Sequence, residues 1–213
     1  MLDGSGIVMR CHGLGFALVA LLCGMFPVGC GETEEPGDSP SVSTYIGVVE
    51  GTEARIAIVQ ADRALQAYVC GRGATLESHT RWFEGELKVQ DAGAAELESD
   101  GWQLRVYASR TTMSGELSAP GGELLLWTAE RVPEDAAKVV GLYESYELGC
   151  RTGVIVWRAE GAECPSQGVW CDEAGELGQV TPAKCGLDGT NGTIVVRGGP
   201  DGSELVVERV QSP

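Results

Sequence analysis

One histidine follows the first 29 residues of this chain: His79, which stands between Ser78 and a Thr-Arg-Trp-Phe run. A histidine beside a hydroxyl has the chemistry of a general base that activates a serine, provided that an acidic residue orients the ring. Such triads draw their members from separate segments, and the chain has no Gly-x-Ser-x-Gly nucleophile motif. We therefore expect His79 to be structural, with an envelope hydrolase centred on His79 as the alternative.

A second set of chemically capable groups is a series of carboxylates downstream of His79. Two carboxyl groups at a fixed separation can supply the acid and base, or the acid and nucleophile, for hydrolysis of a glycosidic bond. The members of this set are Glu84, Glu86, Asp91 and Glu96. Nothing in their spacing fixes a separation, so a carboxylate pair stays an alternative catalytic hypothesis and no catalytic residue is assigned.

Tryptophan side chains could line a binding cavity, because small β-barrels are able to hold one small ligand. The chain has five tryptophans, Trp82, Trp102, Trp127, Trp157 and Trp170. Three of them, Trp82, Trp102 and Trp127, are the candidates for a ligand cavity inside a β domain. Core packing is the competing interpretation of the same residues.

Metal-ligand patterns are weak in this sequence. The loops 188–191 and 201–204 carry oxygen ligands that suit calcium, but neither has EF-hand spacing, and Asp-Gly and Asn-Gly are ordinary turn sequences. The cysteines form no CxxC pair and have no histidine beside them, which argues against a zinc site. We predict no metal and no cofactor.

The first residues have the layout of a secretory signal. The stretch from Gly13 to Val28 is almost wholly apolar, with Arg10 before it and acidic residues after Cys30. It is short for a membrane span, which needs about 20 apolar residues. Met9 is a credible start in place of Met1, because Arg10 would then follow the initiator directly.

The run from Phe26 to Cys30 resembles a bacterial lipobox, in which a cysteine is lipidated and becomes the new N-terminus. Val28 and Gly29 fit this pattern, whereas Pro27 departs from the leucine that is usual three places before the cysteine. The resemblance implies lipidation of Cys30 and a lasting membrane anchor. The alternative is an ordinary thiol after a signal-peptidase cut.

Location and partners follow from the anchor and from charge. Gly31 after Cys30 carries no acidic inner-membrane retention signal, so we expect the outer membrane rather than the inner one, with the domain periplasmic or surface-exposed. The net charge of −16 argues against nucleic acid and against docking on anionic lipid. The expected partners are the membrane, through the lipid, and a small molecule or a protein.

Five cysteines follow Cys30, in a compartment that permits disulfides. They are Cys70, Cys150, Cys164, Cys171 and Cys185. Because the number is odd, one of them must stay free or pair between chains. We favour Cys70 with Cys150, and Cys171 with Cys185 or Cys164, although the spacing does not determine the connectivity.

These residues must be positioned by an all-β domain, because short runs rich in β-branched and aromatic residues recur about every 8 to 12 positions from Tyr45 onward. The predicted strands are 45–50, 55–60, 65–70, 86–90, 102–108, 113–118, 123–129 and 140–146. Turn residues at 50–52, 61–62 and 120–122 predict hairpins, and alternation predicts one buried and one solvated face. Only Pro133 to Lys138 looks briefly helical. Such strands favour an antiparallel up-and-down meander that closes as a small barrel.

The hydrophobic pattern of the sequence changes after Cys150. One more strand is expected at 154–158, little periodicity appears from 162 to 189, and a closing hairpin is expected from 193–197 and 204–210. The predicted organisation is a signal peptide (1–29), a flexible tether (30–43), a barrel domain (44–158), and a disulfide-stapled C-terminal appendage with its hairpin (159–213).

Several short motifs between Tyr45 and Val156 resemble an uncharacterised family of secreted or membrane-tethered proteins of high-GC bacteria. They are 45–52 (YIGVVEGT), 68–70 (YVC), Trp82-Phe83, 100–102 (DGW), 114–117 (SGEL) and 137–143, which ends in Gly-Leu-Tyr. The resemblance implies a shared scaffold and no activity. The function expected from the sequence is therefore a lipid-anchored binding or structural module, with the envelope hydrolase as the alternative.

Overall fold

The computed structural model describes residues 41–88, 93–158, 163–181, 183–184, 192–199, 201–211 and 213, which belong to one compact unit. The predicted leader, the predicted lipidation site Cys30 and most of the predicted tether lie outside the described residues, as do Asp91, Cys185 and the loop 188–191. No helix in the described parts of the chain has the length and apolar character of a membrane span.

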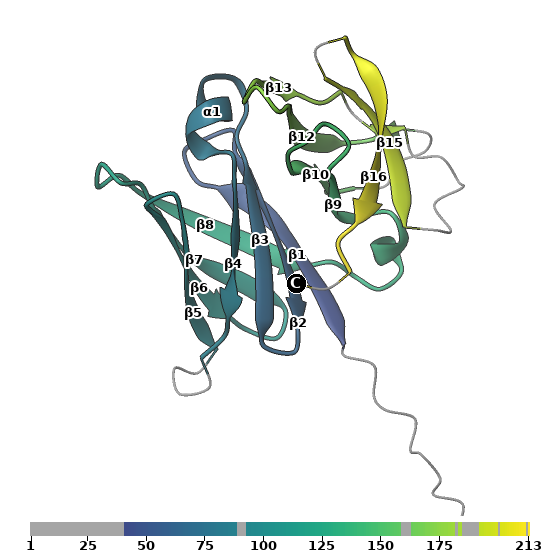
Figure 1. Ribbon diagram of the computed structural model, residues 1–213. Helices are drawn as coiled ribbons and strands as arrows, with labels where there is room; N and C mark the ends of the chain where they lie inside the picture. The colour runs from purple at the N-terminus through teal and green to yellow at the C-terminus, as the bar shows by residue number, and fades with distance from the viewer. Residues whose placement is uncertain are drawn as a thin grey trace, which may run out of the picture. The chain divides into compact units, whose positions relative to one another are not determined.

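The first sheet is a nearly closed antiparallel barrel of eight strands (Figure 1). The strands are β1 (Val42–Val49), β2 (Arg55–Ala61), β3 (Ala64–Cys70), β4 (Arg81–Glu86), β5 (Ala94–Ser99), β6 (Trp102–Ala108), β7 (Thr112–Ser118) and β8 (Leu124–Arg131). Their order is β4-β3-β2-β1-β8-β7-β6-β5, so β8 returns to pair with β1. This arrangement confirms the predicted meander.

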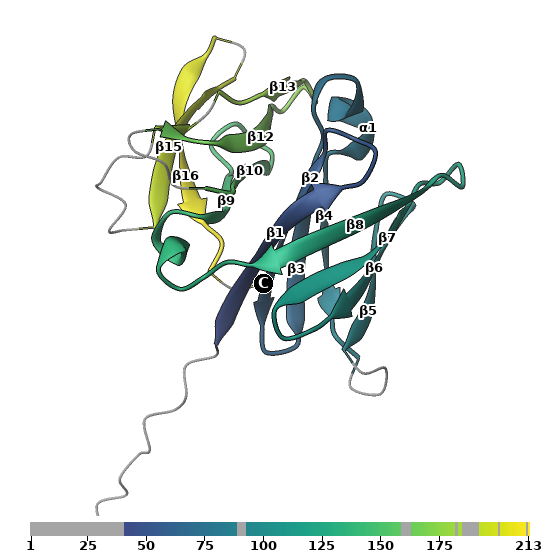
Figure 2. The ribbon, with the colours of Figure 1, turned by 180° about the vertical axis from the view of Figure 1, so that it is seen from behind.

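The two edge strands, β4 and β5, face each other where the barrel is not hydrogen-bonded shut (Figures 1 and 2). A Cβ atom at Gly85 of β4 would lie 2.3 Å from Cδ2 of Leu97 in β5. The missing side chain therefore lets Leu97 fill the gap, which closes the barrel by packing.

Local turn chemistry sets the register of the barrel hairpins. The predicted turns at 50–52, 61–62 and 120–122 join β1 to β2, β2 to β3 and β7 to β8. A fourth tight turn joins β5 to β6, where Asp100 and Gly101 have φ angles of 48° and 77° between the paired Ser99 and Trp102. Two successive positive φ values match the type I′ hairpin, which follows the natural twist of the strands.

Two barrel strands differ from the sequence prediction. The fourth strand is β4, 81–86, and not 86–90, and β5 was not predicted. The β5 sequence AAELES alternates correctly, with Ala95 and Leu97 buried. Alanine and glutamate are weak strand formers, which conceals this signal.

The barrel interior is filled by side chains. The largest of them, among them Phe83, Met113, Leu117 and Trp127, are at most 1% exposed. The core of the first sheet therefore lies inside the barrel, and side chains occupy the barrel interior.

The second half of the chain forms another eight-stranded antiparallel sheet. Its strands are β9 (Gly141–Ser145), β10 (Thr152–Val156), β11 (Glu163–Cys164), β12 (Ser166–Cys171), β13 (Leu177–Gln179), β14 (Ala183–Lys184), β15 (Thr193–Gly198) and β16 (Ser203–Arg209). Their order is β11-β14-β15-β16-β9-β10-β12-β13, and the predicted closing hairpin is confirmed as β15–β16.

The predicted end of the barrel domain at residue 158 differs from the structure, because β9 and β10 belong to the second sheet and not to the barrel. β8 is already paired with β7 on one edge and with β1 on the other, so the following strand, β9, finds no free edge beside it. The chain instead leaves through η3 (Ala136–Lys138), a 3₁₀ turn that Asp135 caps by accepting a bond from the Ala136 amide. The predicted helical signal at 133–138 corresponds to this turn.

Besides the barrel core and the core of the second sheet, a third apolar cluster lies between the two sheets. From the barrel it includes Ala57, Val59, Tyr68 and Cys70, and from the second sheet Leu142, Ile155 and Val169. The prediction that β2 and β3 have one solvated face is therefore wrong, because the second sheet covers the outer face of both strands. The fit is close: a Cβ atom at Gly153 would lie 2.5 Å from the Tyr68 ring.

Candidate functional site

The three tryptophans predicted to share a ligand cavity do not share one. Trp102 and Trp127 belong to the packed barrel core, whereas Trp82 packs on the outside, against the cluster between the sheets. Trp82 precedes the inward-facing Phe83 in β4, and successive side chains of a strand point to opposite faces. Alternation thus separates Trp82 from the other two.

His79 lies in α1 (Leu76–His79), a single turn that follows η1 (Gly73–Thr75) between β3 and β4. Its side chain is 7% exposed, and its Nδ1 is 2.7 Å from the Ser78 hydroxyl. The buried Nε2 has no hydrogen-bond partner. Burial lowers the pKa of His79, Glu123 opposes that shift, and Arg81 adds to it.

A hydrolytic triad is not assembled around this histidine. The serine that bonds His79 is its own chain neighbour, and the ring packs against Trp102 with centroids 5.2 Å apart. Arg81 stacks on the same indole, 4.3 Å from the ring centroid, and donates a hydrogen bond to the Ser78 carbonyl. His79 thus packs on Trp102 at one end of the barrel, as a structural residue would.

The described members of the carboxylate set each pair with a different arginine. Glu84 is 2.7 Å from Arg151, while Glu86 pairs with Arg63 and Glu96 with Arg105. The carboxylates hold arginines along three separate parts of the sheet. They are not gathered as an acid and base pair.

The disulfide connectivity corrects the favoured pairing. Cys150 bonds to Cys171 of β12, and Cys70 is free and buried. Cys164 is also disulfide-bonded. The Cys70 thiol points into the cluster between the sheets, where burial raises its pKa to about 12. Cys70 ends β3 on its covered face, and Cys150 instead lies in the loop before β10, within reach of β12.

Two arginine–tryptophan stacks flank the cluster between the sheets, and sequence reasoning missed both. The Arg151 guanidinium lies 3.8 Å from the Trp82 ring centroid, and that of Arg55 lies 3.7 Å from the Trp157 centroid. Arg151 directly precedes β10 and Trp157 directly follows it. Each sheet therefore supplies one cation and one ring, and both ends of β10 are held on the barrel.

Arg151 makes the more extensive contact of the two arginines. It bonds Glu84 of β4 and Glu144 of β9, both at 2.7 Å, and its own carbonyl accepts a bond from the Trp82 indole. A buried glutamine adds to the junction, since Gln167 of β12 donates to the Cys70 carbonyl at 2.7 Å. Partners so far apart in sequence leave no local signal.

The loop 201–204, predicted as a possible calcium ligand set, serves as a turn in the structure. The Asp201 carboxylate accepts a bond from the Ser203 amide, and this bond lowers its pKa. Glu204 pairs with Arg197 across the β15–β16 hairpin. Over the described residues, no three acidic, histidine or cysteine side chains are grouped as a metal site.

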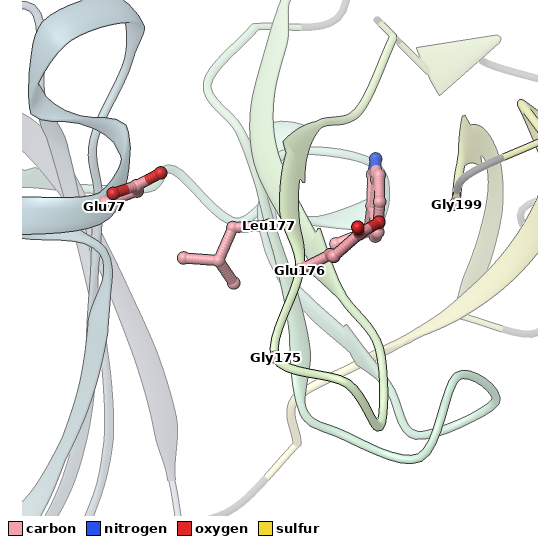
Figure 3. A pocket seen from close by; sticks show the side chains of 6 residues that line it. Glu77, Gly175, Glu176, Leu177 and Gly199 are labelled. Atoms are coloured by element: carbon pink, nitrogen blue, oxygen red, sulfur yellow. The ribbon is translucent and has the colours of Figure 1, made fainter.

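A recess of about 700 Å³ lies between α1 and the second sheet. It is lined by Glu77 of α1, Trp170 of β12, Gly175, Glu176 and Leu177 at the β12–β13 connection, and Gly199. Figure 3 shows Glu77 and Leu177 pointing toward each other, whereas the Glu176 side chain points away from Glu77, to the side of Gly199. The recess therefore has one exposed carboxylate on each side of Leu177, with Trp170 and glycine backbone in the rest of its lining.

Trp170 forms the aromatic part of this recess and closes the core of the second sheet. A Cβ atom at Gly178 would lie 2.5 Å from its indole, so this position must be glycine for the ring to fit, and a Cβ at Gly198 would lie 3.0 Å from the same indole. Only 9% of Trp170 is exposed.

No protein-family model matches this chain, and a comparison with curated proteins finds no similar sequence.

Proposed function

We propose that this chain is a lipid-anchored envelope protein whose domain binds a partner without chemically changing it. The binding site is the recess between α1 and the β12–β13 connection, and the ligand presents a positively charged group to Glu77 and Glu176. The recess carries the proposal: it is an open surface hollow that combines an indole edge, a leucine and backbone groups with two carboxylates.

The charge of the molecule supports a cationic ligand. The chain carries a net charge of −16, and an acidic surface raises the local concentration of cations around it. Glu77 and Glu176, both exposed, add negative charge at the rim of the recess. We infer that an ammonium or guanidinium group is the preferred feature of the ligand.

Binding is favoured over hydrolysis by the way the catalytic candidates are used. The His79 ring is buried against Trp102 and is occupied by Ser78, and the described carboxylates of the second set each pair with an arginine. These groups stabilise the fold. The membrane anchor rests on the lipobox-like sequence at Cys30 and on the polar tether that follows it.

A titration with Nα-acetyl-lysine methylamide, followed by NMR of isotope-labelled protein, tests the recess. We expect the largest shifts at Gly175, Leu177 and the Trp170 indole. Glu77→Gln and Glu176→Gln should each weaken binding about threefold, since one exposed ion pair contributes about 0.2–1 kcal/mol. Glu98→Gln, which alters an exposed carboxylate of β5, is the matched control and should bind as the parent does.

The neutral analogue Nα-acetyl-glutamine methylamide should bind about tenfold more weakly, the combined effect of the two carboxylates. Equal shifts with both probes, or shifts located elsewhere on the surface, would refute the recess as a cation site. The anchor is tested separately by labelling cells with a fatty acid: the parent should incorporate it and Cys30→Ser should not. Incorporation in both would contradict the anchor and leave the recess untouched.

A further inference from the structure

The short helix α1 belongs to two parts of the molecule at once. Glu77 lines the recess, whereas His79, two residues later, plugs the barrel against Trp102. Both residues lie on one four-residue turn that packs against β3 and β13 (Figure 1). A change that displaces His79 must therefore move Glu77 as well.

The contacts of His79 suit its neutral form. Its Nδ1 shares a hydrogen bond with the Ser78 hydroxyl, while Nε2 is buried and has no partner. In the imidazolium form both ring nitrogens carry hydrogens, so Nε2 is a buried donor without an acceptor, whereas the neutral tautomer with its hydrogen on Nδ1 donates to the Ser78 hydroxyl and leaves no such donor. The Arg81 guanidinium already lies over the same Trp102 ring, which places like charge beside an added proton.

Other charged groups also face this histidine. Glu123, which precedes β8, attracts the imidazolium, and Asp100, in the β5–β6 turn, acts on Arg81. Glu77 lies on the same helical turn. The balance among them favours the neutral ring, since burial with Arg81 outweighs Glu123 and the pKa of His79 is lowered.

We propose that protonation of His79 releases α1 from the end of the barrel, so that mild acid opens the Glu77 wall of the recess. The open arrangement, in which His79 has left Trp102, binds a proton more readily than the closed one, because its imidazole is hydrated. Acidification below the ordinary histidine range, about pH 6.5, therefore shifts the population toward the open arrangement, by up to tenfold per unit of pKa difference. This regulation acts on the proposed binding site, but the movement of α1 does not depend on any ligand.

Amide hydrogen exchange of the full chain at pH 7.5 and pH 5.0, expressed as protection factors, tests the proposal. We expect protection at residues 76–80 to be lost in acid, while the β2 and β3 amides keep theirs. His79→Gln, which stays neutral, should show no such difference between the two pH values.

A second variant makes the test independent of whether His79→Gln folds well. Glu123→Gln removes the group that favours the imidazolium in the closed arrangement and so widens the pKa difference from the open one; the loss of protection between pH 7.5 and pH 5.0 should therefore become larger. A purely structural role for His79 would leave the acid response of this variant equal to that of the parent. Unchanged parent protection, or an equal acid response in His79→Gln, would overturn the proposal.

The lysine probe separates this proposal from the one on which it rests. If α1 opens and the recess binds, the affinity for Nα-acetyl-lysine methylamide should change between the two pH values in the parent and stay constant in His79→Gln. If protection falls at 76–80 but the probe never binds, the pH response stands and the binding function fails.

Discussion

The barrel and the second sheet contain equal numbers of strands but are assembled in different ways. In the barrel the strands β1 to β4 and β5 to β8 pair with their neighbours in sequence, and only the β1–β8 pairing joins distant segments. In the second sheet β16 returns to β9, β10 pairs with β12, and β11 pairs with β14. Local hairpins thus specify the first sheet, whereas the second needs long-range closure, a disulfide and the barrel surface to hold it.

This difference implies that the second sheet depends on the barrel. Its β10 is fully buried, with the barrel on one face and its own core on the other, and both ends of β10 stack on barrel residues. The barrel, by contrast, has its own enclosed core. The following experiments measure that dependence.

The largest effect is expected from Trp127→Ala, which removes the largest side chain of the barrel core. The loss should be about 4 kcal/mol in the free energy of unfolding, as for other aromatic-to-alanine changes in cores. Denaturant unfolding, followed by amide exchange in both sheets, should show the same loss in each. A loss confined to the barrel strands would mean that the second sheet is independent.

Alkaline pH should weaken the junction between the sheets. The Cys70 thiol has its pKa raised to about 12 by burial, so the folded state keeps a proton that the unfolded chain releases. Stability is therefore fully present below the unfolded thiol pKa and falls as pH rises toward 12, by about 1.4 kcal/mol per pH unit.

Urea unfolding at pH 8, 9.5 and 10.5 measures this slope, and Cys70→Ala should reduce it. The remaining slope should come from Tyr68, whose pKa burial also raises. An equally steep slope in Cys70→Ala would show that the thiol is not buried at the junction.

Removing the Cys150–Cys171 disulfide through the paired serine substitutions should cost about 3 kcal/mol, the value expected for a loop of this size. Because the disulfide lies in the second sheet, exchange should accelerate first at β10 and β12. Differential scanning calorimetry gives the overall loss. Equal acceleration throughout the barrel would instead indicate that neither sheet unfolds alone.

The smallest effect is expected from Gly153→Ala, which places a methyl group against the Tyr68 ring. Overpacking of this kind costs about 1–3 kcal/mol, and we expect about 2. Gly121→Ala is the control, because a Cβ there meets nothing within 4 Å and the turn is exposed. Equal stability of the two variants would contradict the close contact between the sheets.

Most of the barrel was predictable from the sequence because its signals are local. Alternating apolar residues in β2, β3 and β6, together with the turns at 50–52 and 120–122, indicated a meander with nearly correct bounds. The prediction failed at β5, where alanine and glutamate occupy a strand, and at β9 and β10, which have strand character but pair elsewhere.

The candidate site was much less predictable. His79 and the tryptophans could be singled out by residue type, but their surroundings depend on contacts between distant segments. Arg151 and Glu84 are 67 residues apart, and Gln167 bonds a carbonyl 97 residues away. The spacing of residues along the sequence gives no indication of such long-range pairs.

The sequence by itself determined the all-β class, the order of the barrel hairpins and the acidic charge, because propensity, alternation and turn chemistry act over a few residues. Only the tertiary structure decided that both faces of β3 are buried, that Cys150 bonds Cys171, and that α1 joins the barrel end to the recess. Those features arise when the second sheet covers the barrel, and a covered strand and an exposed one can have the same alternating pattern.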